Sequence, residues 1–154
     1  MSISIAKDDL SDRGISDLLA EHLIDMGKFS PAESVHALDV SELHDPAITF
    51  WSAREDRRVV ACGALKKFSS NSGEVKSMKT RTEYLQQGLA SKILQEIITE
   101  ARKQKLSFLY LETGSHESFK PATALYEKYG FVECEPFAEY KLDPHSLFYN
   151  LELD

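Results

Sequence analysis

Hydrophobic positions along the N-terminal part of the chain switch between strand spacing and helix spacing. Ile3 and Ile5 alternate with serines, which predicts a short strand. A polar run rich in aspartate follows, and apolar residues then recur at helical spacing from Ile15 to Met26. This pattern predicts an amphipathic helix, and Gly27 is expected to end it.

The next part of the chain predicts three consecutive antiparallel strands. Weak helical spacing over Phe29 to Asp45 predicts a helical segment, which is either a mobile segment near the substrate of an enzyme or a plain helical connector. Two β-rich runs follow, Ile48 to Arg54 and Arg58 to Phe68, and a short polar link between them is typical of a hairpin. After a polar turn, Glu74 to Thr80 extends the sheet by a third strand.

A long amphipathic helix is predicted after Gly88, with apolar residues from Leu89 to Ala101 on one face. The strand expected next, Ser107 to Glu112, is separated from the preceding strand by this helix, which favours a parallel crossover. Pro121 suits the first turn of another helix, and Gly130 suits its C-terminal cap.

Two short strands complete the pattern, one beginning at Phe131 and one over Leu147 to Leu153. The order of elements predicts an α/β fold with a mixed, mostly antiparallel central sheet of about six or seven strands, flanked by about four helices. No repeat or linker interrupts it, so residues 1–154 are expected to form a single domain.

Composition narrows the classes of partner. The 18 Lys and Arg residues against 25 Asp and Glu residues give a formal charge of −7, which argues against non-specific nucleic-acid binding. The apolar runs are too short to cross a bilayer, and the two cysteines are expected to be reduced. These features favour a cytoplasmic protein without membrane contact, and the histidines and cysteines have no metal-ligand spacing.

A polar turn carrying Gln86, Gln87 and Gly88 joins a predicted strand to a predicted helix. Unpaired N–H groups and the helix dipole converge at such a helix N-terminus, so the turn is suited to bind an anion. The sequence lacks the Gly-Lys-Ser/Thr run of a Walker loop and the paired glycines of a dinucleotide fingerprint. Taken alone, the turn is also compatible with an ordinary capped helix.

A second motif, Pro121 to Phe131 (PATALYEKYGF), lies one strand downstream. Together, the two motifs resemble the GNAT superfamily of acyl-CoA-dependent N-acyltransferases. The family pattern Arg/Gln-x-x-Gly-x-Gly/Ala corresponds to Leu85 to Ala90, and A-x-x-L-Y-E-K-x-G-F corresponds to Ala122 to Phe131. The chain departs from the family at Leu85, where Arg or Gln is usual, and at Phe119, where many members have Asn.

The resemblance implies acetyl-CoA as co-substrate and assigns a set of residues to bind it. The pyrophosphate would lie on the N–H groups of Gln86, Gln87, Gly88, Leu89, Ala90 and Ser91, and the pantetheine arm would pair with the backbone of Met78, Lys79 and Thr80. In the family, the strands on either side of this position splay apart, and a β-bulge is expected over Lys76 to Met78.

The reaction needs an acid for the departing sulfur and a base for the amine. Tyr126 resembles the family's acid, although a tyrosine at helical spacing could equally be a core aromatic. Glu74 and Glu112 are candidate bases, and carboxylates on the strand of Glu74 often take this role in the family, which favours Glu74 slightly.

Polar and aromatic residues at the expected cleft mouth are candidates to bind the substrate. His116 lies in a loop after the strand that ends near Glu112, and Phe137 and Tyr140 lie in the loop before the last strand. His22, on the first predicted helix, is interpreted as structural.

The hypothesis that follows is an acetyl-CoA-dependent N-acetyltransferase that moves an acetyl group to a small primary amine by direct attack in a ternary complex. A protein N-terminus or lysine as acceptor, and a non-catalytic acyl-CoA sensor, remain alternatives. A homodimer is compatible with the sequence, and the acceptor is not specified by it.

Overall fold

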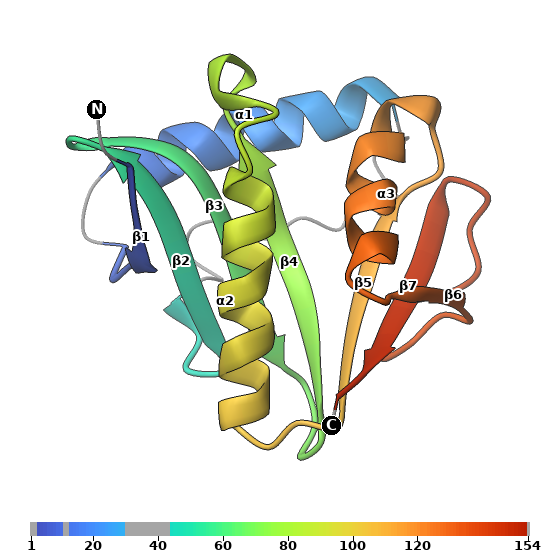
Figure 1. Cartoon of the computed structure of the whole chain (residues 1–154). Helices are drawn as coiled ribbons and strands as arrows, with labels where there is room; N and C mark the ends of the chain where they lie inside the picture. The colour runs from blue at the N-terminus through green and yellow to red at the C-terminus, as the bar shows by residue number, and fades with distance from the viewer. Residues whose placement is uncertain (1–2, 11–12, 30–43, 154) are drawn as a thin grey trace.

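The computed structural model describes residues 3–10, 13–29 and 44–153 as an α/β fold built on one sheet (Figure 1). This sheet has seven strands in the order β1-β2-β3-β4-β5-β7-β6 across the described part of the chain. The strands are β1 (Ile3–Lys7), β2 (Ile48–Glu55), β3 (Arg58–Lys67), β4 (Ser72–Thr80), β5 (Phe108–Gly114), β6 (Val132–Cys134) and β7 (Ser146–Glu152). The helices are α1 (Arg13–Phe29), α2 (Leu89–Lys103) and α3 (Lys120–Lys128), with short 3₁₀ turns η3 (Thr82–Tyr84) and η4 (Glu117–Phe119).

Strand pairing confirms the predicted mixture of directions. Strands β1 to β4 pair antiparallel in chain order, and β5, β7 and β6 also pair antiparallel. The single parallel pair in the described sheet joins β4 to β5, and α2 makes the crossover between them. The expected antiparallel hairpins and the expected parallel crossover are therefore both present.

The helices differ from the prediction in two respects. The prediction of about four helices is one too many for the described chain, which has three α-helices; the remaining expected helix falls mainly on residues 30–43, outside the described residues. In addition, Gly27 does not end α1, which continues to Phe29. A glycine inside a helix costs only about 1 kcal/mol, and the packing of the apolar face of α1 outweighs that cost.

The helices pack on opposite faces of the sheet. Phe50 and Trp51 are neighbours on β2 and therefore point to opposite faces. Phe50 packs in a cluster with the buried residues Ile15, Leu18 and Leu19 of α1, whereas Trp51 packs with the apolar face of α2. Tyr126 of α3 belongs to the α2 side. The sheet is thus covered by α1 on one face and by α2 and α3 on the other (Figure 1).

Strands β4 and β5 part soon after they begin to pair. Their register runs only from Ser72 opposite Phe108 to Glu74 opposite Tyr110. Beyond Glu74 the two strands diverge, and a gap opens between them (Figure 1). The splayed strands expected from the sequence are therefore observed.

A β-bulge distorts β4 next to this gap. The register between β3 and β4 shifts between Cys62 and Ala64, and Ser77 has a positive φ of 58°. The Cys62 thiol donates a hydrogen bond of 3.2 Å to the carbonyl oxygen of Ser77. The bulge predicted over Lys76 to Met78 is confirmed. The buried side chain of Cys62, on the neighbouring strand β3, stabilises it through this hydrogen bond.

A substitution at Gly63 on β3 can test how closely α2 packs against the sheet. A Cβ at Gly63 would lie 2.5 Å from the sulfur of Met78 and 2.7 Å from a γ-methyl of Ile93. We expect Gly63→Ala to reduce the free energy of unfolding by about 1–3 kcal/mol, because Ile93 is buried and has stiff χ1. Chemical denaturation measures the change. Gly27→Ala is the matched control, because nothing lies within 4 Å of its Cβ, and it should stabilise by up to about 1 kcal/mol.

Candidate active site

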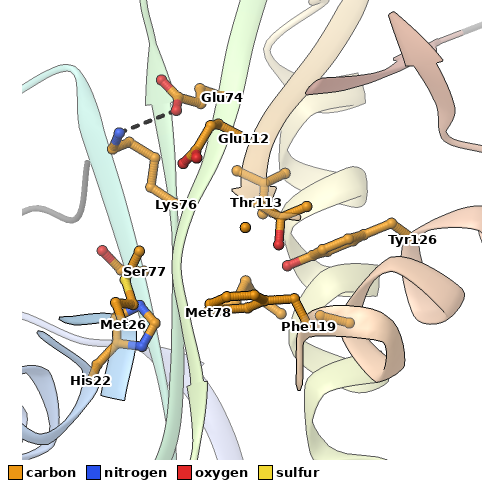
Figure 2. Close-up of a pocket in the computed structure, with 13 residues that line it drawn as sticks. His22, Met26, Glu74, Lys76, Ser77, Met78, Glu112, Thr113, Phe119 and Tyr126 are labelled. Atoms are coloured by element: carbon orange, nitrogen blue, oxygen red, sulfur yellow. Dashed lines mark hydrogen bonds and ion pairs between the residues drawn. The ribbon is translucent and has the colours of Figure 1, made fainter. Parts of the chain in front are cut away.

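A cavity of about 100 Å³ occupies the gap between β4 and β5 (Figure 2). Its walls come from both faces of the sheet: His22 and Met26 lie on α1, whereas Ala122 and Tyr126 lie on α3. The described lining also includes Glu74 to Met78 of β4, Glu112 to Gly114 of β5, and Phe119. The cavity therefore passes through the sheet where the two strands have separated.

Glu112 enters the cavity near the end of β5. The Ser146 hydroxyl of the neighbouring strand β7 donates a hydrogen bond of 2.8 Å to one of its carboxylate oxygens. Burial raises the pKa of Glu112 to about 7, and the Ser146 hydrogen bond and the Lys76 charge only partly oppose this effect. Glu112 can therefore accept or release a proton near neutral pH.

Tyr126 reaches the same cavity from α3, and Figure 2 shows its phenol pointing toward the space between the two strands. Its side chain is buried against Phe131, with ring centroids 5.8 Å apart. Burial, and then the charge of Glu112, raise the pKa of Tyr126 well above the ordinary value. The phenol therefore keeps its proton, and its oxygen makes no hydrogen bond to another residue in the described part of the chain.

Glu74, the other predicted base, is engaged in a buried polar network. One of its oxygens accepts hydrogen bonds from Lys76 Nζ (3.1 Å) and from the Tyr140 hydroxyl (2.5 Å). The Glu74 and Lys76 side chains are only 7% and 8% exposed. Burial, and then the Glu74 charge, raise the pKa of Tyr140 and keep its phenol protonated. Among the described residues, Glu74 thus accepts hydrogen bonds from two side chains, whereas Glu112 accepts one, from Ser146.

The three residues predicted to bind substrate are not among the described residues that line the cavity. Phe137 is buried in an aromatic cluster, with its ring centroid 4.9 Å from those of Tyr110 and Tyr140. The hydroxyl of Tyr140 donates a hydrogen bond to the Glu74 carboxylate. His116 is exposed at the start of η4, where its Nδ1 accepts a hydrogen bond from the Ser118 N–H. Substrate contact at these positions stays a prediction.

Three residues that line the cavity were not expected to do so from the sequence. His22 and Met26 lie one helical turn apart on α1, and Phe119 comes from η4. Burial lowers the pKa of His22 to about 4, and the nearby positive charge of Lys79 contributes in the same direction. His22 is therefore neutral at physiological pH. The position of His22 in the helical pattern of α1 does not indicate a site. The contact of α1 with the gap is a result of tertiary packing, which the local pattern does not specify.

The N-terminus of α2 has the backbone geometry expected of the predicted anion cradle. Gly88 is the N-cap residue with φ 80°, and Gln86 also has a positive φ of 64°. The Lys92 N–H bonds to the Gly88 carbonyl, so the three preceding N–H groups, of residues 89–91, lack an intrahelical acceptor. The Ser91 hydroxyl is bonded to the Tyr129 hydroxyl. The turn therefore offers backbone N–H groups rather than side chains, which fits a phosphate-bearing ligand.

The backbone of Met78 to Thr80 lies at the open edge of β4. Lys79 and Thr80 pair with Cys62 and Ala61 of β3, whereas the pairing with β5 has already ended at Glu74. The Lys79 side chain turns toward α1, where its Nζ contacts Asp25 at 2.5 Å. This edge is thus available to pair with an extended ligand.

Comparison with known proteins identifies the family. The profile of the Acetyltransferase (GNAT) family matches residues 12–131, which include both motifs and the gap between β4 and β5. The chain belongs to this family. Relatives that resemble it include the uncharacterized N-acetyltransferase YsnE of Bacillus subtilis (strain 168), which is 49% identical over 95% of this chain and 97% of its own length. Another is the uncharacterized N-acetyltransferase YedL of Escherichia coli (strain K12), which is 46% identical over 97% of this chain and 94% of its own length.

Solved structures agree with the GNAT assignment. A Klebsiella pneumoniae chain assigned to the acyl-CoA N-acyltransferases superimposes with a TM-score of 0.81, at 28% identity over 99% of this chain and 98% of its own. A GNAT acetyltransferase of Elizabethkingia anophelis with acetyl-CoA bound gives a TM-score of 0.70 at 18% identity, over 98% of each chain, and so shares the fold. The predicted fold and the predicted enzyme class, an N-acetyltransferase, are both confirmed.

Cys62 and Cys134 are both free thiols. Among the described residues there is no helix with the length and apolarity that a bilayer crossing needs, and no group of three or more His, Cys, Asp and Glu side chains placed to hold a metal ion.

The raised pKa of Glu112 predicts a pH-dependent loss of stability. Between its ordinary value of 4.5 and about 7, the folded chain holds a proton on Glu112 that the unfolded chain releases. Stability should therefore fall as pH rises through this window, whereas Glu112→Gln should lack this loss. Denaturation from pH 4 to pH 8 tests the difference. Glu96→Gln, at an exposed position on α2, is the control and should follow the unmodified protein.

Proposed function

We propose that this chain is an acetyl-CoA-dependent N-acetyltransferase that acts on small primary amines. The observation that carries the proposal is the convergence of Glu112 and Tyr126 in one cavity, from β5 and α3 respectively. One group has a pKa of about 7, and the other keeps a phenolic proton. A base and an acid that line the same cavity are suited to transfer from a thioester to an amine.

The cradle and the open edge of β4 supply the binding half of the proposal. The N–H groups of Leu89 to Ser91 suit the pyrophosphate, and the backbone of Met78 to Thr80 suits the pantetheine arm. Acetyl-CoA supplies the acyl group as a thioester. The presence of acetyl-CoA in a solved family member of the same fold supports this choice.

The catalytic half assigns one proton to each group. Glu112 accepts, directly or through one water, the proton that the amine loses as its nitrogen bonds to the acyl carbon. Tyr126 donates its hydroxyl proton to the sulfur as the carbon–sulfur bond breaks, and solvent exchange then returns the proton from Glu112 to Tyr126. The contacts of Glu74 with Lys76 and Tyr140 favour Glu112 over Glu74 as the base.

The small volume of the cavity favours a small acceptor. About 100 Å³ holds several water molecules, since one needs roughly 10–15 Å³ of such volume, and so accommodates the reacting groups. A peptide N-terminus or lysine would need an open trough leading to Glu112, and a small amine would not. Release of free thiol from acetyl-CoA across a panel of amines tests the proposal, and absence of release with every amine would favour an acyl-CoA sensor instead.

Substitutions at the two glutamates should separate their roles. We expect Glu112→Gln to lower kcat/KM about 10²-fold or more, and to abolish the rise in kcat/KM centred near pH 7. Glu74→Gln should retain that rise, because Glu112 is still present. Tyr126→Phe should lower kcat more than it raises KM. A pH profile lost in Glu74→Gln and kept in Glu112→Gln would reverse the assignment.

Coenzyme binding should depend on the backbone conformation at Gly88. Gly88→Ala strains a position with φ 80° and should raise the Kd of acetyl-CoA about tenfold, because a misdirected turn loses several N–H contacts together. Leu85→Gln restores the residue usual in the family pattern and should leave the Kd unchanged or lower it. Calorimetry and the thermal shift with acetyl-CoA measure both changes. Equal affinity of Gly88→Ala and the unmodified protein would contradict the cradle.

A further inference from the structure

A second hollow adjoins the catalytic cavity on the side of α1. It has a volume of about 390 Å³ and lies between α1, the end of β4 and η4. We call it the vestibule, and its lining comprises His22, Asp25, Met26, Lys28, Lys79 and Phe119, with Ser118. His22, Met26 and Phe119, which Figure 2 shows in the catalytic cavity, line the vestibule as well, so the two spaces adjoin at these three side chains.

The volumes of the catalytic cavity and the vestibule indicate where the different parts of an acceptor would lie. The catalytic cavity holds the amine and the acyl group, and its volume leaves little room for the rest of the acceptor. The vestibule falls in the range of pockets that hold small ligands, roughly 300–1,000 Å³. An acceptor whose nitrogen reaches Glu112 therefore places its remaining groups in the vestibule.

The vestibule has an excess of positive charge. Asp25 contacts Lys79 at 2.5 Å and Lys28 at 3.5 Å, so one carboxylate lies between two ammonium groups. The hydrogen bond from Lys79 holds the pKa of Asp25 below its ordinary value. His22 feels the same excess, because the positive charge of Lys79 lowers its pKa more than the charge of Asp25 raises it. An anionic group is thus better matched to the vestibule than a second cation.

The neutral imidazole of His22 adds a hydrogen-bonding group at the boundary. His22 is half-buried and has no hydrogen bond to another residue in the part of the chain that the structure describes. A neutral imidazole has one donor and one acceptor nitrogen. Its position between an anion-attracting vestibule and a cavity that receives an amine suits it to orient an acceptor that carries both groups.

We propose that the acceptor carries a carboxylate in addition to its amine, with the carboxylate bound in the vestibule by Lys28 and Lys79 and oriented by His22. The substrate class is therefore an amino acid, either with an α-amine or with an amine at the end of its side chain. This inference deepens the proposed function and rests on it for the position of the reacting amine.

The test compares acceptors in matched pairs that differ by the carboxylate alone. Suitable pairs are leucine with isopentylamine, methionine with 3-(methylthio)propylamine, and 6-aminohexanoate with pentylamine. The measure is the ratio of kcat/KM for the acid to kcat/KM for its amine. Two partly exposed ammonium groups should make this ratio about tenfold in at least one pair.

Three variants then change the charge of the vestibule in known directions. Lys28→Met, at an exposed helix position, should lower the ratio about threefold, and Asp25→Asn should raise it because both lysines lose their competing carboxylate. Lys67→Met, at an exposed position near the end of β3, is the matched control and should keep the ratio of the unmodified protein. Loss of an anchor between α1 and β4 alone would not move the ratio in opposite directions.

The outcomes distinguish failure of this inference from failure of acetyl transfer. Ratios of one or below in every pair, with amines acetylated, would overturn the vestibule as a carboxylate site and leave the proposed function intact. A weaker Kd for acetyl-CoA in Lys28→Met with an unchanged ratio would assign the lysine to the coenzyme and overturn the inference. If no acceptor is acetylated, equilibrium dialysis of the same pairs against the protein saturated with CoA decides: a preference for the acids that falls in Lys28→Met supports the inference, and no preference overturns it.

Discussion

The structure depends on the early separation of β4 from β5. Pairing ends at Glu74 opposite Tyr110, and no hydrogen-bonded ladder fills the gap beyond that point. A gap in the middle of a sheet leaves backbone groups without strand partners, which is costly unless a ligand or side chains satisfy them. The bulge at Ser77, supported by the Cys62 thiol, turns β4 away from β5 and keeps the gap open. The side chains that line the cavity reach this gap from the two faces of the sheet.

Two carboxylates near the gap have different surroundings, and this difference separates their chemistry. Glu74 accepts hydrogen bonds from the buried ammonium group of Lys76 and from the hydroxyl of Tyr140. Glu112 has a single hydroxyl donor, and burial dominates its pKa. Two nearby carboxylates on adjacent strands thus have different hydrogen-bond partners, and the proposed function assigns the base to the one with a single donor.

Local patterns were sufficient to predict most of the fold but not the selection among site residues. Strand alternation, the helix after Gly88 and the crossover that it makes depend on short-range spacing, and all are observed. Tyr140, which donates a hydrogen bond to Glu74, is 66 residues away in the sequence. No rule of sequence spacing predicts a contact between residues so far apart. His22 was interpreted as structural for the same reason, since its role at the boundary of two cavities follows from the crossing of α1 over the gap.

The bond between Tyr129 and Ser91 has a mechanical consequence. Ser91 belongs to the first turn of α2, which forms the cradle, and Tyr129 follows Tyr126 by one turn at the end of α3. Gln95 donates a second hydrogen bond of 2.5 Å to the same phenol oxygen, so the two helices are joined at a three-residue junction. The proposed anion cradle and the proposed acid are therefore linked by hydrogen bonds between α2 and α3, and in the proposed reaction a shift at the phosphate end of the coenzyme would be transmitted toward the acid. Redesign of either helix for a different acyl donor has to move both together.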